Sequence, residues 1–261
     1  MHVVPGIEAL EPAHGPLFVV VGVFDGLHRG HLYLLDELER AAATRAANAA
    51  VVTFDHHPDE IVIGSAPPLL CDPQERLERL AAAGVDVTVV QHFDVALRMT
   101  TYDAFIRQIA ERSKLAGFLM TPDSSFGYER GGTPETVADL GRVMGYEVAV
   151  VPPFELDGQP VRSSDIRGAI AAGDLRAAER LLGRPVTLSA TLGQADDHGV
   201  HSLRFDLPVA LPPAGVYAAR LEGSGGPASV VVRAGAAGVR IDTEAGPADG
   251  RRITLELIAP T

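Results

Sequence analysis

Short apolar segments alternate with amphipathic segments from Leu17 to about Gly183. The apolar runs are rich in Val, Phe and Ala, are typical of buried strands, and fall at 17–24, 49–54, 86–93, 116–121 and 147–151. The segments between them space their apolar residues as a helix does, at 30–47, 73–83, 101–113, 133–144 and 164–182. This alternation predicts βαβ units, and therefore an α/β fold with a doubly wound, mostly parallel sheet.

After Gly183 the pattern changes to short β-like runs separated by Gly, Pro and Asp. Such spacing predicts a small antiparallel sheet or barrel of roughly 70–80 residues. The boundary falls near Arg184, which divides the chain into domains of 1–183 and 184–261. Within the second domain, the sequence EGSGGP at 222–227 predicts a hairpin loop.

Charge and composition narrow the classes of function. The net charge of −12 over 261 residues provides no basic face for nucleic acid, although backbone N–H groups and a few arginines suffice for a small phosphate ligand. The single cysteine, Cys71, excludes an internal disulfide. No signal-peptide pattern opens the chain, and no apolar run approaches the roughly 18 residues of a membrane span. We therefore expect a cytoplasmic protein that binds neither nucleic acid nor membrane.

The decapeptide GVFDGLHRGH, residues 22–31, follows the first predicted strand. Its glycines allow a close approach of the backbone to a ligand, and a helix is expected to begin near Arg29 with its N–H groups and positive dipole end facing that ligand. His28 and His31 share one side of the first turn and could donate to phosphoryl oxygens. The alternative is a glycine turn with two surface histidines. No Lys-Ser/Thr follows the glycines, so the loop is not a Walker A motif.

The decapeptide resembles the G-x-F-D-G-x-H-x-G-H motif of the bacterial bifunctional riboflavin kinase/FAD synthetases. Its H-x-G-H core is shared with other nucleotidyltransferases of the class I aminoacyl-tRNA synthetase-like superfamily. Further segments resemble the same family in the same order: TFDHHP (53–58), DSSFGYERGG (123–132) and VRSSDIR (161–167). The resemblance covers roughly 17–185 and implies a Rossmann-like nucleotidyltransferase domain followed by a kinase barrel.

The activity implied by this resemblance is adenylyl transfer. The phosphate of FMN would attack the α-phosphorus of ATP, giving FAD and pyrophosphate with the help of Mg²⁺ that enters with the nucleotide; the resemblance assigns no protein residue as a metal ligand. The implied catalytic residues, which would contact the triphosphate, are His28, His31, Ser164 and Arg167. The implied nucleotide-binding residues are Gly22, Val23, Phe24, Asp25, Gly26, Gly30 and Ser163.

The acceptor half of the site departs from the family pattern. His56 stands in place of a proline, and Ser124 in place of an aromatic residue, which removes stacking surface for a flat ring. The implied acceptor-binding residues are His56, His57, Pro58, Asp123, Ser124, Ser125 and Phe126. His56 and His57 could read a polar acceptor, or could be solvated loop residues. The acceptor, FMN or another phosphorylated small molecule, therefore stays open, as does CTP in place of ATP.

The second domain lacks the residues that the resemblance requires for a riboflavin kinase. Where the family carries P-T-A-N, this chain has His201, Ser202, Leu203 and Arg204, and Arg240 stands near the place of the catalytic Glu. We therefore expect no flavokinase activity, and a barrel kept for structure, for homodimer contacts or for closing the acceptor pocket. A non-catalytic flavin- or nucleotide-binding regulatory protein is the alternative from another class.

Overall fold

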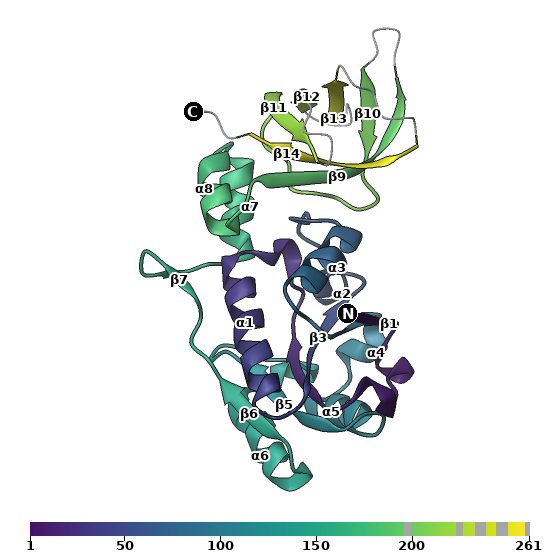
Figure 1. Cartoon of the computed structure of the whole chain (residues 1–261), viewed down its shortest axis with the longest axis vertical. Coiled ribbons are helices and arrows are strands. Elements are labelled where there is room, and N and C mark those ends of the chain that lie inside the picture. Colours follow the sequence, from purple (N-terminus) through teal and green to yellow (C-terminus); the bar gives the residue numbers. More distant parts are fainter. Residues whose placement is uncertain (196–199, 223–226, 233–238, 244–249, 259–261) are drawn as a thin grey trace. The chain divides into compact units, whose positions relative to one another are not determined.

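The computed structural model describes residues 1–195, 200–222, 227–232, 239–243 and 250–258. The chain divides into two compact units, the first formed by 1–67 and 77–160 and the second by 68–76 and 161–261 (Figure 1). This division differs from the boundary expected at 183–184, because residues 161–183 group with the barrel into which they lead.

The first unit is built on a six-stranded parallel sheet with the order β1-β4-β3-β2-β5-β6. The strands are β1 (His2–Val4), β2 (Leu17–Val21), β3 (Asn48–Phe54), β4 (Val87–Gln91), β5 (Leu115–Met120) and β6 (Glu147–Val150). The predicted doubly wound α/β fold is confirmed. β1 was not predicted, because three residues are too short to show a period of two.

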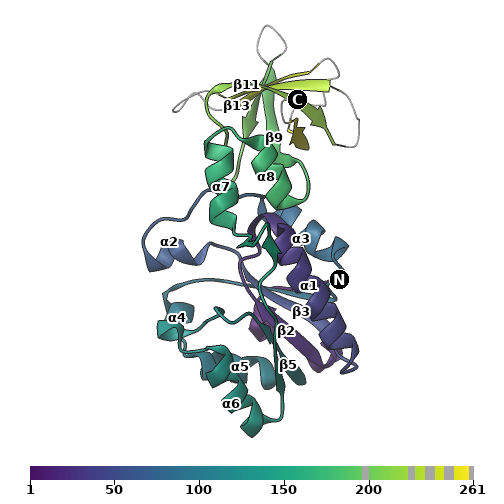
Figure 2. The same ribbon diagram turned by 90° about the vertical axis from the view of Figure 1, so that its left-hand side faces the viewer.

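Helices cover both faces of this sheet (Figure 2). Helices α1 (Arg29–Ala43) and α3 (Pro73–Ala82) pack in the core on one face, and α4 (Val95–Arg98), α5 (Tyr102–Ala110) and α6 (Pro134–Met144) in the core on the other. The short helix α2 (Pro58–Val62) buries none of its residues. Alternate residues of β2 enter different cores: Phe18 packs in one apolar cluster with Leu38 of α1, whereas Val19 packs in the other with Ile106 of α5. The strands are therefore apolar on both faces, as their sequences predict. A two-stranded ladder, β7 (Glu155–Leu156) with β8 (Gln159–Pro160), ends the unit.

The second unit opens with two helices, α7 (Ser163–Ala171) and α8 (Leu175–Leu182). The sequence predicts one helix over 164–182, and this is wrong in detail. Gly173 adopts φ 78°, and the Asp174 side chain accepts a hydrogen bond from the Ala177 N–H, so that a new helix begins there.

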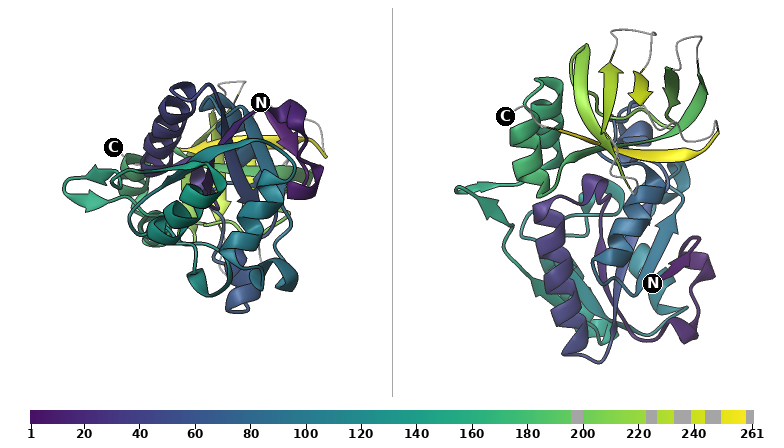
Figure 3. Two further views of the ribbon diagram at one scale, coloured as in Figure 1. Left: turned by 90° about the horizontal axis from the view of Figure 1, so that it is seen from below. Right: turned by 45° about the horizontal axis from the view of Figure 1, so that its top comes forward.

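The helices lead into a closed antiparallel barrel with the order β10-β13-β12-β11-β14-β9 (Figure 3). Its strands are β9 (Val186–Ala195), β10 (His201–Arg204), β11 (Gly215–Leu221), β12 (Pro227–Val232), β13 (Val239–Thr243) and β14 (Arg252–Leu257). The predicted antiparallel barrel is confirmed. Residues 223–226 of the expected hairpin loop lie outside the described residues.

The segment 68–76 belongs to the second unit because buried polar bonds tie it to the barrel. The buried Glu75 carboxylate accepts hydrogen bonds from Thr187 Oγ1 at 2.6 Å and Ser189 Oγ at 2.7 Å. Arg252 Nη2 donates to both carboxylate oxygens of Asp72, at 2.9 and 2.7 Å. A buried carboxylate is stable only when such partners replace water. Among the helices described, none is long and apolar enough to cross a membrane.

Candidate functional site

A cavity of about 690 Å³ opens at the edge of the sheet where the parallel strands end. Three residues at strand ends line it: Val21 is the last residue of β2, Phe54 is the last residue of β3, and Phe93 lies two residues beyond β4. The loop 125–130 also lines the cavity. Ligands of open α/β sheets bind at this edge, and a volume of this size suits a cofactor-sized molecule.

The loop that follows β2 turns through residues with positive φ. Phe24 adopts a left-handed conformation with φ 53°, and Gly26 follows with φ 75°. His28 then caps helix α1, its Nδ1 atom accepting from the His31 N–H at 3.3 Å. The two imidazoles stack with their ring centroids 3.7 Å apart. The predicted helix start is confirmed, and the two histidines stand as a fixed pair at its N-terminus.

His31 is electrostatically unusual. Its Nδ1 atom is buried and has no hydrogen-bond partner in the described part of the chain. Burial, reinforced by the neighbouring His28 imidazole, lowers the pKa of His31 well below its ordinary value. The ring is therefore neutral at pH 7, with one nitrogen that donates and one that accepts. A buried polar atom without a partner, at a helix N-terminus, is a feature typical of a site that an anion completes.

The other predicted triphosphate contacts lie in the second unit. Ser163 and Ser164 form the first turn of α7, as expected, and Arg167 follows one turn later. The Arg167 Nε atom donates to the Pro68 carbonyl at 2.8 Å within the same unit. The pairing of these residues with the two histidines stays a prediction.

Part of the predicted acceptor set lines the cavity. His57, Pro58, Ser125 and Phe126 are on its wall together with the predicted nucleotide-loop residues Gly22 and Val23. A second cavity of about 310 Å³ shares four wall residues with the first and is lined by Asp123 and Ser124.

Two of the predicted acceptor residues have other contacts. The Ser124 hydroxyl accepts from the Thr121 N–H at 2.9 Å and so closes its own turn. His56 is absent from the walls of both cavities, and its imidazole faces Asp55 at 3.1 Å.

The structure adds lining residues that the sequence analysis missed. The aromatic rings of Phe54 and Phe93 pack edge to face, with centroids 5.2 Å apart, on the cavity wall. Tyr128, the cations Arg98 and Arg130 and the acidic residues Asp59 and Glu129 also line the cavity. The position of Phe54 and Phe93 at the ends of neighbouring strands was the available signal. Aromatic surface is therefore present although Ser124 replaces an aromatic residue.

Arg130 is the cation placed to serve both cavities. It lines each of them, and its Nε atom donates to Ser125 Oγ at 2.7 Å. That hydrogen bond fixes the start of the guanidinium fork and leaves its terminal nitrogens as donors of the planar type that fits phosphate. Apolar rings with one such fork are a suitable site for a flat phosphorylated ligand.

A parallel sheet, a histidine pair at a helix N-terminus and a ligand-sized cavity at the carboxyl edge together define a nucleotide-binding α/β protein. Residues 10–165 match the family model described as FAD synthetase, which is more than half of the chain. The chain therefore belongs to the FAD synthetase family.

Curated relatives carry the name bifunctional riboflavin kinase/FMN adenylyltransferase. The protein from Escherichia coli K12 is 30% identical over 259 residues, covering 94% of this chain and 82% of the relative. That from Pseudomonas fluorescens is 30% identical over 190 residues, and the match spans 61% of its length.

Among solved structures, one titled a macrolide-efflux protein from Streptococcus pneumoniae superposes with a TM-score of 0.81 at 22% identity, covering 100% of this chain and 90% of the other. At that identity the likeness shows the fold alone.

The lowered pKa of His31 predicts a measurable pH dependence. In the unfolded chain a histidine protonates near pH 6.5, whereas His31 in the folded protein does not. The unfolded state therefore binds more protons below that pH, and folding stability should fall as the pH drops from about 7 to 5. In ¹³C-histidine NMR spectra the His31 resonance should not titrate near pH 6.5. His31→Gln should flatten the stability curve in urea unfolding, and a His31 titration at or above pH 6.5 would contradict the assignment.

Proposed function

We propose that this protein transfers the adenylyl group of ATP to the phosphate of FMN and releases pyrophosphate. The observation that carries the proposal is the aromatic cavity at the carboxyl edge of the sheet, on whose wall lie Gly22 and Val23 of the loop that ends in His28 and His31. Membership of the FAD synthetase family and the names of the curated relatives support the same reaction.

The cavity suits a flavin as the acceptor. A flat, three-ring isoalloxazine gains most from aromatic side chains, and Phe54, Phe93 and Phe126 line the wall. Arg98 and Arg130 would supply positive charge for the FMN phosphate. The substitution at Ser124 therefore changes a turn at the smaller cavity and leaves the aromatic wall of the larger one in place.

Adenylyl transfer depends on neutralisation of negative charge more than on proton transfer. An oxygen of the FMN phosphate would bond to the α-phosphorus while the bond from that phosphorus to the oxygen bridging to the β-phosphorus breaks, and pyrophosphate would leave. The nucleophile is already ionised near neutral pH, so no general base is required. His28, His31 and the N-terminus of α1 would stabilise the charge that develops. The family resemblance assigns Ser164 and Arg167 to the leaving phosphates, and this assignment stays a prediction.

Mg²⁺ fits this scheme as the partner of the triphosphate. The ion keeps several waters and prefers phosphate and carboxylate oxygens. The nucleotide loop offers one carboxylate, Asp25, which is buried and already engaged in interactions. We therefore propose that the ion is bound mainly by the phosphates, where it would neutralise charge, while the histidines position the α-phosphate.

A substrate panel tests the proposed reaction. Purified protein with Mg²⁺ should form FAD from ATP and FMN and release pyrophosphate. Pyrophosphate release and the mass of the product are measured. The panel offers each of ATP, CTP, GTP and UTP with FMN and with other phosphorylated small molecules. It therefore distinguishes the proposed pair, ATP and FMN, from another donor or acceptor. His31→Ala should lower turnover by about 100-fold, because it removes a donor to the transition state.

The matched control is His2→Ala, which removes an exposed histidine from β1. It should leave turnover unchanged. Full activity of His31→Ala would refute the phosphate role of the histidine pair. Absence of turnover with every pair, alongside measurable FMN or ATP binding, would favour a regulatory binding protein instead.

We further propose that the barrel lacks flavokinase activity. The residues at the place of the P-T-A-N motif form strand β10, whose pairing with β9 shifts in register between His201 and Leu203. Both of these residues are buried, and His201 Nδ1 lies 3.1 Å from the Gly193 carbonyl. Ser202 is paired with Arg240 across the ladder. The barrel cavity that includes Arg204 measures about 30 Å³, whereas ligand sites of this kind occupy about 300–1,000 Å³. We assign the barrel a structural role.

Riboflavin offered with ATP and Mg²⁺ tests the role of the barrel. We expect no FMN above the uncatalysed background, because the strand provides no metal-binding Thr–Asn pair and no carboxylate base. Formation of FAD from FMN in the same preparation is the positive control. Steady accumulation of FMN at a rate comparable to that of FAD formation would refute a purely structural barrel.

A further inference from the structure

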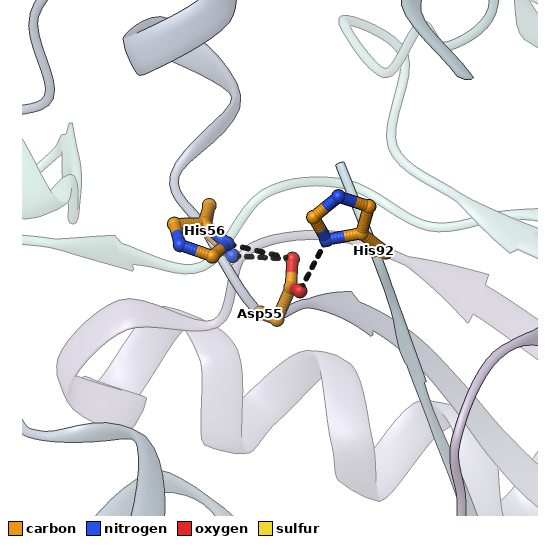
Figure 4. Close-up of side chains that lie close together, drawn as sticks. All are labelled: Asp55, His56 and His92. Atoms are coloured by element: carbon orange, nitrogen blue, oxygen red, sulfur yellow. Dashed lines mark hydrogen bonds and ion pairs between the residues drawn. The ribbon is translucent and has the colours of Figure 1, made fainter. Parts of the chain in front are cut away.

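Three side chains able to bind a metal ion gather beyond the ends of β3 and β4 (Figure 4). One of them, His56, belongs to the predicted acceptor set, but none of the three lines either cavity. Asp55 and His56 follow β3 directly, and His92 follows β4 directly. In the described residues this is the group whose potential ligand atoms all lie within 4.8 Å of one another. Figure 4 shows both imidazoles turned toward the Asp55 carboxylate from different sides.

The spacing of the ligand atoms is close to that of a metal centre. His92 Nδ1 lies 2.6 Å from Asp55 Oδ2, and His56 Nδ1 lies 3.1 Å from Asp55 Oδ1. Around a tetrahedral zinc ion with bonds of about 2.0–2.1 Å, neighbouring ligand atoms are about 3.3 Å apart. Rotation of the exposed imidazoles would bring these separations to the spacing that an ion requires.

The central carboxylate is positioned by the backbone. The N–H groups of His56 and Phe93 donate to Asp55 Oδ1 at 2.7 and 3.0 Å, and the Asp55 N–H donates to the Gln91 carbonyl at 3.2 Å. Burial alone would raise the pKa of Asp55, but the hydrogen bonds from His92, Phe93 and His56 outweigh it and lower the pKa to about 2. Asp55 is thus a fixed anion at neutral pH.

We propose that Asp55, His56 and His92 form a binding site for a divalent transition-metal ion of the zinc class. Two imidazoles and one carboxylate are donors that zinc, nickel and copper prefer, whereas magnesium and calcium prefer oxygen atoms alone. The site is therefore distinct in chemistry from the Mg²⁺ that accompanies ATP. Three protein ligands leave at least one coordination position for water or for an oxygen of a ligand.

Occupancy of this site would act on the walls of the large cavity. Each of the three ligands is adjacent in sequence to a residue that lines the cavity: Asp55 follows Phe54, His56 precedes His57, and His92 precedes Phe93. A bound ion would tie the loop after β3 to the loop after β4. It would therefore fix the edge-to-face pair of Phe54 and Phe93 in place.

Titration of the tag-free, EDTA-treated full chain with Zn²⁺ tests the proposal, by calorimetry or by competition with a chromogenic chelator. One ion should bind per chain, and Co²⁺ in its place should give the visible absorption of a low-symmetry site. His92→Ala should weaken Zn²⁺ binding by about 10- to 100-fold or more, since even loss of an outer partner costs that much. His56→Ala should do the same.

The controls distinguish loss of metal binding at the site from unfolding of the variant and from non-specific binding elsewhere. His56 and His92 side chains are 45% and 62% exposed, so both variants should retain the circular dichroism and unfolding curve of the parent. His2→Ala, which removes a histidine beside the chain's N-terminal amine, should leave Zn²⁺ binding unchanged. Absence of stoichiometric binding, or equal affinity in His92→Ala and the parent, would overturn the proposal. Because the readout is metal binding, neither result depends on the adenylyl-transfer reaction.

Discussion

The parallel pairing of β2 with β3 on one side and with β5 on the other is the interaction on which the rest of the first unit depends. In a parallel ladder every strand points the same way, so all carboxyl ends meet at one edge. At that edge Gly22, Asp55 and His92 are each the first residue after a strand. Residues distant in sequence therefore converge there, and the cavity and the metal-binding cluster both follow from strand order.

The same pairing makes the edge rigid. The inner strands are buried on both faces, with alternate residues of β2 entering two separate cores. Hydrogen bonds continue past the strands: the Gly22 N–H donates to the Val52 carbonyl at 3.0 Å, and Thr53 Oγ1 to the Val23 carbonyl at 3.0 Å. The left-handed turn at Phe24 thus begins from a fixed point. A site that stabilises a transition state needs its donors fixed in this manner.

The fold could be predicted from sequence wherever the signal is periodic. Runs of apolar residues located the five longer strands, and helical spacing located the main helices. Isolated residues decide the rest: Gly173 with Asp174 splits one predicted helix into two, and β1 is placed by pairing with β4, not by its own pattern. Those are tertiary and stereochemical effects, which a pattern of hydrophobicity does not contain.

The candidate site shows the same division. The loop motif predicted that His28 and His31 share the first turn of a helix, but the stacking of their rings and the partnerless Nδ1 atom of His31 depend on packing. His56 and His57 are adjacent and chemically identical, yet the Nδ1 atom of His57 accepts from the Asp59 N–H while His56 faces Asp55. The direction of each side chain is set by the backbone as it leaves β3, which sequence alone does not give.

The aromatic cavity at the carboxyl edge is proposed to receive the flavin, and FMN binding tests this role most directly. Titrating FMN with protein and following flavin fluorescence should give saturable binding that Phe93→Ala weakens by about 5-fold, because stacking on one aromatic ring is worth about 1 kcal/mol. Phe154→Ala is the matched control, since that ring packs against Tyr33 instead. Equal FMN dissociation constants for Phe93→Ala and the parent would contradict the account.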